Sequence, residues 1–214
     1  MTNDAERFED LTPELPPVRG FLHRAESDDV FVLTHSAGGN CNAPLLVAVA
    51  EEFAQRNLNV LRCDLPFRQR RPKGPPMRTA NEDQRGLRRA AELMRARFSG
   101  RVFMGGHSYG GRMASMLVAE DPSLASALLL LSYPLHPPKK PQQVRTQHFA
   151  ELRTPTLFVQ GTKDEFATIG EIDAARKLAA GKNELLVIEG AGHSLAPKFA
   201  ERIVDAFMGF VGQG

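Results

Sequence analysis

The chain has 214 residues, with 27 lysines and arginines against 25 aspartates and glutamates and a formal net charge of +2. This length is typical of one domain with a substantial buried core, and the small net charge argues against a general polyanion partner, so we expect no nucleic-acid binding. The apolar and charged fractions, 42% and 24%, are those of an ordinary globular protein. Because no apolar run approaches the ~20 residues of a membrane-spanning helix, we expect no membrane partner.

The first 17 residues, MTNDAERFEDLTPELPP, are polar, acidic and end in two prolines, and they lack the apolar stretch of a signal peptide. We predict a flexible N-terminal arm at 1–17 and a single domain at 18–214. The two cysteines, Cys41 and Cys63, match no metal-binding or redox spacing. They are expected to be reduced core residues of a cytoplasmic protein that binds no metal.

Short apolar runs alternate with helical patterns along the rest of the chain. Strands are predicted at 18–23, 30–34, 60–63, 102–104, 127–131, 156–159 and 184–188. Helices are predicted at 43–56, 81–98, 113–120, 170–180 and 197–210, with at most a short helix at 142–149 in the proline-rich segment 132–153. This alternation predicts a three-layer α/β fold, a mostly parallel sheet of about six or seven strands with helices on both faces.

The stretch RVFMGGHSYGGRMASMLVAE, residues 101–120, is the most informative part of the chain. It places the pentapeptide Gly106-His107-Ser108-Tyr109-Gly110 between a buried strand and an amphipathic helix. That context is typical of a nucleophile elbow, in which a serine lies in a sharp turn with φ > 0. Neighbouring backbone leaves no room for side chains two residues to either side, and both positions are glycine.

Two further loops carry the groups that a serine nucleophile needs. A hydroxyl attacks only when a base accepts its proton, and a histidine oriented by a carboxylate serves that purpose near neutral pH. Asp164 and His193 each follow a predicted strand, at an edge where catalytic groups of parallel sheets lie. Glu165 is the competing carboxylate. The remaining histidines nearby, His35 and His107, are expected to have structural roles.

An oxyanion hole is expected from two backbone N–H groups. One belongs to Tyr109, directly after the serine, and the other to Ala37 in the glycine-containing loop 35–39. No metal ion or organic cofactor is needed for this chemistry.

A basic, proline-rich loop, DLPFRQRRPKGPP, follows the strand at 60–63. Two interpretations of it are open. In one, the loop is a solvated, charge-rich surface. In the other, Arg68, Arg70 and Arg71 bind a carboxylate or phosphate of the substrate, because guanidinium groups form bidentate contacts with such anions.

From about residue 18 to 212 the sequence resembles the α/β-hydrolase superfamily, whose nucleophile, acid and base occur in the order of Ser108, Asp164 and His193. SYPLHPPKKP, TPTLFVQGTKDEF and EGAGHSL are similar to a small, lidless, dienelactone-hydrolase-like branch. That branch includes relatives of a testis-expressed hydrolase-like protein and of a chromatin-complex subunit. The resemblance implies a three-layer α/β-hydrolase fold without a large cap domain. Two departures are Ser36, where an H-G opening is common, and Ser108, where dienelactone hydrolases have cysteine.

We therefore predict a serine hydrolase acting on an ester of a small substrate, with thioesters and amides as less favoured substrates. An anionic ester is predicted if the basic loop binds substrate. The alternative is a catalytically silent hydrolase fold that serves as an interaction module, because fold alone does not guarantee activity. The sequence predicts no oligomeric state.

Overall fold

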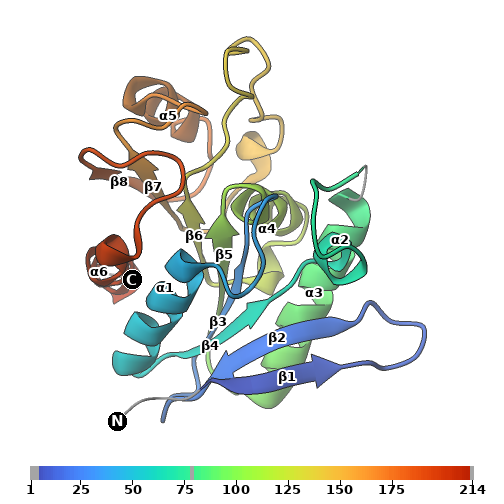
Figure 1. Cartoon of the computed structure of the whole chain (residues 1–214). Helices are drawn as coiled ribbons and strands as arrows, with labels where there is room; N and C mark the ends of the chain where they lie inside the picture. The colour runs from blue at the N-terminus through green and yellow to red at the C-terminus, as the bar shows by residue number, and fades with distance from the viewer. Residues whose placement is uncertain (1–4, 78–79, 213–214) are drawn as a thin grey trace.

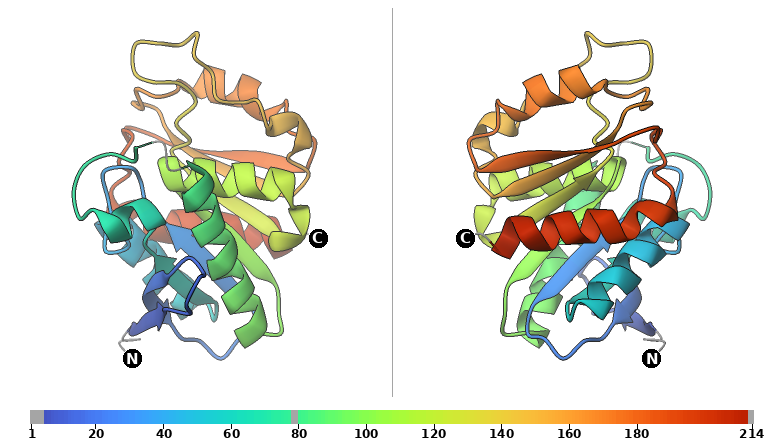
Figure 2. Two further views of the ribbon diagram at one scale, coloured as in Figure 1. Left: turned by 90° about the vertical axis from the view of Figure 1, so that its right-hand side faces the viewer. Right: turned by 90° about the vertical axis from the view of Figure 1, so that its left-hand side faces the viewer.

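The computed structural model describes residues 5–77 and 80–212. One eight-stranded sheet lies between two layers of helices (Figures 1 and 2), with strand order β1-β2-β4-β3-β5-β6-β7-β8. The strands are β1 Glu6–Asp10, β2 Val18–His23, β3 Val30–Thr34, β4 Asn59–Cys63, β5 Val102–His107, β6 Ala127–Leu131, β7 Thr156–Gly161 and β8 Asn183–Ile188. The helices are α1 Pro44–Gln55, α2 Pro66–Arg70, α3 Ala80–Arg97, α4 Tyr109–Glu120, α5 Ile169–Arg176 and α6 Ala200–Gly212. Short 3-10 helices lie at Pro122–Leu124, Phe149–Glu151 and Pro197–Phe199.

The sheet is parallel from β4 to β8, and only β1 and β2 run antiparallel to their neighbours. The carboxyl ends of the six parallel strands therefore meet at one edge, and the loops that leave them gather there. This arrangement confirms the predicted three-layer architecture with a mostly parallel sheet. It has eight strands, rather than six or seven.

The additional strand corrects the prediction of a flexible arm at 1–17. Glu6–Asp10 forms β1 and pairs antiparallel with β2, with Phe8 opposite Gly20. Four of the five residues of β1 are charged, so no apolar alternation revealed it; Phe8 alone packs against the core. Residues 1–4 of the predicted arm lie outside the described residues.

Side chains of the central strands point alternately to the two faces of the sheet, and each face contributes to its own hydrophobic core. In β3, Val30 and Val32 face α3 and α4, whereas Phe31 and Leu33 face α1 and α6. The α1 and α6 side contains a cluster of aromatic rings formed by Phe31, Phe53, Phe103 and Phe207. Burying apolar area on both faces holds the strand ends, and hence the loops that follow them, in a fixed arrangement.

Two local differences from the predicted elements follow from proline. Pro66 at the start of α2 begins a short helix where a loop was predicted, because a proline fits the first turn of a helix without losing a hydrogen bond. Within 132–153 the only helix of the structure is the 3-10 turn Phe149–Glu151, later than the predicted 142–149. Cys41 and Cys63 are buried free thiols, as predicted.

Candidate active site

Ser108 occupies the turn between β5 and α4, with φ of 52°. Its N–H donates a hydrogen bond of 2.8 Å to the carbonyl oxygen of Leu131 at the end of β6. A Cβ atom at Gly106 would lie 2.4 Å from the Thr34 oxygen, and one at Gly110 would lie 2.6 Å from the His35 oxygen. The turn thus requires glycine at both positions, for the steric reason that the sequence indicated.

The structure brings Ser108, His193 and Asp164 into contact. His193 Nε2 lies 2.8 Å from Ser108 Oγ, and His193 Nδ1 lies 2.9 Å from both carboxylate oxygens of Asp164. Because carboxylate oxygens accept hydrogen bonds, the proton of a neutral His193 belongs on Nδ1, and Nε2 is left to accept the Ser108 hydroxyl proton. The three residues follow β5, β8 and β7, which end at the same edge of the sheet.

The Asp164 carboxylate is itself held in place. Its side chain is fully buried and accepts the Phe166 N–H at 2.8 Å and the Gln160 amide at 2.7 Å. Gln160 is a fully buried polar residue that follows the apolar residues 157–159 of β7, and the sequence analysis did not single it out. The sequence signal that could have revealed Gln160 is a glutamine directly after an apolar run that predicts a buried strand.

Aromatic contacts fix the ring of His193 from two sides. The Phe166 ring stacks on it with a centroid distance of 4.0 Å, and the His107 ring lies at 5.4 Å. His107 Nε2 donates to the His193 carbonyl oxygen at 2.7 Å. Burial lowers the pKa of His107 to about 4, so its ring is neutral near pH 7. His107 therefore has the structural role that was predicted for it.

The loop 35–39 after β3 carries the predicted second oxyanion donor. Within the described residues, the N–H of Ala37 donates to no protein acceptor, which leaves it available to a substrate oxygen. Tyr109 is the first residue of α4, so its N–H lies at the positive end of the helix dipole. His35 holds the base of this loop, since its Nδ1 donates to the Ser36 oxygen and its Nε2 accepts the Leu65 N–H.

Arg68 does not have the predicted role of an anion clamp. It is 5% exposed, and its guanidinium group donates to four backbone carbonyl oxygens, those of Ala37, Gly39, Arg71 and Gly74. Two of these carbonyls belong to the loop 35–39, so Arg68 ties that loop to the basic loop.

The other two arginines of the basic loop lie elsewhere. Arg70 donates to Glu82 on α3, and Arg71 contacts the sulfur of Met77. The three guanidinium groups are not brought together, because α2 directs them to different sides.

Asp83 on α3 is a site residue that the sequence analysis missed. It is fully buried and accepts the Phe67 N–H at 2.9 Å and the Tyr109 hydroxyl at 2.7 Å. It therefore ties α2 to the first residue of α4, beside Ser108. The sequence contains a signal for this role, because the helical spacing of α3 places Asp83 on the same apolar face as the buried Leu87, Ala90 and Met94.

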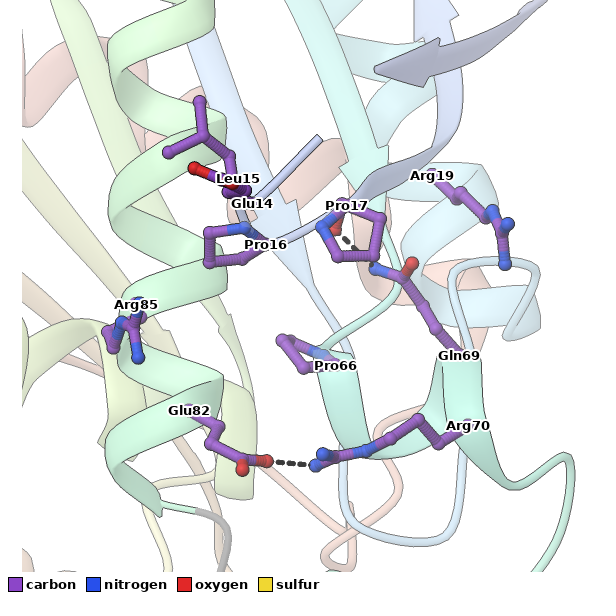
Figure 3. A pocket seen from close by; sticks show the side chains of 10 residues that line it. All are labelled: Glu14, Leu15, Pro16, Pro17, Arg19, Pro66, Gln69, Arg70, Glu82 and Arg85. Atoms are coloured by element: carbon purple, nitrogen blue, oxygen red, sulfur yellow. Dashed lines mark hydrogen bonds and ion pairs between the residues drawn. The ribbon is translucent and has the colours of Figure 1, made fainter. Parts of the chain in front are cut away.

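A cleft with a volume of about 700 Å³ opens beside His193. It lies between the loop 35–39, the start of α1 and residues 190–199, and Pro44, Leu45 and Phe199 make part of it apolar. A smaller pocket of about 380 Å³, shown in Figure 3, lies between residues 14–19, α2 and α3. Neither Ser108 nor His193 lines that second pocket, whereas His193 is among the residues that line the cleft.

A family model described as an alpha/beta hydrolase domain matches residues 27–204. The chain belongs to this family. Its fold is the α/β-hydrolase fold without a separate cap domain. Membership of the family supports hydrolase activity.

Three solved structures share the fold of this alpha/beta hydrolase. Est1E from Butyrivibrio proteoclasticus is 16% identical, with a TM-score of 0.77 over 97% of this chain and 99% of that chain. A dienelactone hydrolase from Anabaena variabilis is 19% identical, with a TM-score of 0.76 over 96% and 94% of the two chains. An alpha-beta serine hydrolase homologue from Coxiella burnetii is 17% identical, with a TM-score of 0.74 over 100% and 98%.

Within residues 5–77 and 80–212 of the alpha/beta hydrolase, no three histidine, cysteine, aspartate or glutamate side chains converge as a metal site requires. Nor does any helix in these ranges combine the length and apolarity needed to cross a bilayer.

Proposed function

We propose that this alpha/beta hydrolase is a serine hydrolase that cleaves small carboxylic esters through an acyl-enzyme. The observation that carries the proposal is the 2.8 Å contact between Ser108 Oγ and His193 Nε2, with the Asp164 carboxylate on the other ring nitrogen. A serine paired with a base that is itself oriented by an acid has the geometry of an activated nucleophile.

In the proposed reaction, Ser108 Oγ attacks the ester carbonyl carbon while its proton moves to His193 Nε2. The negative charge that develops on the carbonyl oxygen is stabilised by the N–H groups of Tyr109 and Ala37. When the bond to the leaving group breaks, His193 donates its proton to the departing alkoxide. Asp164 stabilises the imidazolium throughout.

Water completes the cycle. His193 takes a proton from a water molecule, the hydroxide attacks the acyl-serine, and the carboxylic acid leaves as Ser108 recovers its proton from His193. The residues 190–199 line the cleft on the side of His193, and the proton donor must lie beside the leaving group, so we assign this cleft to the alcohol part of the ester.

The absence of a cap domain favours small or exposed acyl groups. One solved structure of Est1E has ferulic acid bound, and aryl carboxylic esters therefore belong in the first substrate panel. Thioesters and amides should be included in that panel, because they react through the same steps with different leaving groups.

The test is labelling with a fluorophosphonate probe, followed by mass spectrometry of the labelled peptide. We expect the wild type to be labelled at Ser108, Ser108→Ala to be unlabelled and His193→Ala to be labelled far more slowly. Ser123→Ala removes a hydroxyl on the short helix Pro122–Leu124 and serves as the matched control, with wild-type labelling. A folded wild type that takes up no label would contradict the proposal and favour an interaction module.

A further inference from the structure

A cluster of polar and basic side chains lies between α4 and the segment 132–149, which follows β6. Counted from Ser108 into α4, Arg112 and Ser115 have the i, i+4, i+7 spacing that places side chains on one helix face. Ser115 Oγ lies 2.8 Å from His148 Nε2, so this face meets the segment (Figure 1). The end of this helix face at Ser115 therefore contacts the segment after β6.

Two arginines give the cluster its charge. Arg112 and Arg145 are half-buried, and within the described parts of the chain neither forms an ion pair with an aspartate or glutamate. Arg145 Nη1 donates to the Pro134 carbonyl oxygen at 3.1 Å, and Arg112 Nε is buried without a hydrogen-bond partner. An arginine has five N–H donors, so most of the donors of this pair are not used by the protein.

Burial and the positive charge of Arg112 dominate the electrostatic surroundings of Arg145 and His148. Burial, and then the charge of Arg112, lowers the pKa of Arg145. The same two causes lower the pKa of His148 to about 4, so His148 is neutral near pH 7. Tyr133 lies against Arg112 and donates to the Arg145 carbonyl oxygen at 2.6 Å, which holds Arg145 in place. Two half-buried like charges lower the stability of a protein, and binding of an anion between them offsets that cost.

We propose that Arg112 and Arg145 bind a carboxylate carried by the acyl part of the ester substrate. The inference rests on the proposed function of Ser108. Four residues of α-helix rise about 6 Å, and helical side chains lean toward the N-terminus, so Arg112 leans toward Ser108. The leaving group is assigned to the cleft beside His193, and the acyl group then extends along α4 toward the two arginines. Guanidinium groups suit a carboxylate because they bind both of its oxygens.

The test compares two esters of matched length, p-nitrophenyl pentanoate and the mono-p-nitrophenyl ester of glutaric acid. We expect Arg112→Gln and Arg145→Gln each to lower kcat/KM for the glutarate ester about tenfold or more beyond any effect on the pentanoate ester. Arg112→Lys, which keeps the charge, should recover part of the loss. Arg97→Gln, an exposed arginine at the end of α3, is the matched control and should leave the ratio of the two rates unchanged.

A binding measurement keeps the inference separate from the proposed function. Glutarate should bind the Ser108→Ala protein in calorimetry and should bind Ser108→Ala/Arg112→Gln about tenfold more weakly or worse. Inorganic phosphate should displace glutarate from the Ser108→Ala protein only poorly. Phosphate binding tighter than glutarate would overturn the assignment to a substrate carboxylate. If the Arg112 and Arg145 variants lost kcat/KM equally on both esters, the site would be overturned. It would also be overturned if the preference for the glutarate ester disappeared in Arg70→Gln/Arg71→Gln instead. Failure of all ester turnover with intact glutarate binding would count against the proposed function alone.

Discussion

The guanidinium group of Arg68 donates a hydrogen bond of 2.8 Å to the carbonyl oxygen of Ala37, the residue whose N–H is proposed to hold the oxyanion. A second hydrogen bond of 2.7 Å reaches the Gly39 oxygen. These bonds hold the peptide groups that follow Ala37. The Ala37 N–H belongs to the preceding Ser36–Ala37 peptide group, whose carbonyl oxygen accepts the Gly39 N–H at 3.0 Å, so Arg68 steadies the loop on which that peptide group depends. Arg68 is in this sense a positioning residue that need not touch substrate.

We expect Arg68→Lys to lower kcat by about ten- to a hundredfold with a smaller change in KM, because a misdirected oxyanion donor acts mainly in the transition state. A lysine retains the positive charge, but its single ammonium group cannot donate to four separate carbonyl oxygens as the planar guanidinium group does. Steady-state kinetics on a p-nitrophenyl ester give kcat and KM of the wild type and the variant, and circular dichroism verifies that the variant is folded.

The control for this prediction is Lys73→Ala, which removes an exposed positive charge from the same basic loop. It should behave as wild type. If Lys73→Ala and Arg68→Lys were equally impaired, the general charge of the loop rather than the hydrogen bonds of Arg68 would be responsible.

Tyr109→Phe tests the link between the elbow and α3. It removes the hydroxyl that donates to the fully buried Asp83, and a buried hydrogen bond to a carboxylate contributes about 1.5–3 kcal/mol. Tyr133→Phe is the matched control, since its hydroxyl donates to a neutral carbonyl oxygen, worth about 1 kcal/mol. Urea denaturation should show the larger loss for Tyr109→Phe, and the reverse order would contradict this role of Asp83.

Much of the fold was predictable because its signals are local in the chain. The central strands are short apolar runs, and the elbow combines a strand, a fixed pentapeptide and a helix. The meeting of Ser108, Asp164 and His193 followed from chain order, since parallel strands end at one edge of the sheet. By contrast, β1 depends on pairing with β2, and its charged residues carry no such local signal.

Side-chain direction limited the prediction of the site. Arg68, Arg70 and Arg71 are close in sequence, but α2 turns them toward the loop 35–39, Glu82 and Met77 respectively. No pattern of residue types specifies those directions. Arg112 and Arg145 are 33 positions apart, and the packing of the segment 132–149 on α4 brings them together.

Gly106→Ala tests how tightly β5 lies against β3 beneath the serine. The added Cβ would lie 2.4 Å from the Thr34 carbonyl oxygen, a backbone atom of a central strand that cannot move aside. We expect a loss of about 1–3 kcal/mol or more in the free energy of unfolding, together with a lower kcat as Ser108 shifts.

Gly209→Ala is the matched control for Gly106→Ala. Nothing lies within 4 Å of a Cβ at Gly209, which is inside α6, so this change should stabilise the protein by about 0.5–1 kcal/mol. If both substitutions destabilised the protein equally, the close approach at Gly106 would not be the cause.

His107 predicts how the stability of the fold depends on pH. Burial lowers its pKa from 6.5 to about 4 in the folded protein, so the unfolded chain binds a proton first as the pH falls. The stability that comes from keeping this ring neutral is complete above pH ~6.5 and is lost between pH ~6.5 and ~4, with a total of about 3 kcal/mol.

Urea denaturation at several pH values should show this decline in the free energy of unfolding. The decline should be shallower in His107→Gln, whose amide is able to donate to the His193 carbonyl oxygen. His23 and His148, whose pKa values burial also lowers to about 4, keep a residual slope in that variant. Parallel curves for wild type and His107→Gln would show that His107 is not a source of the decline.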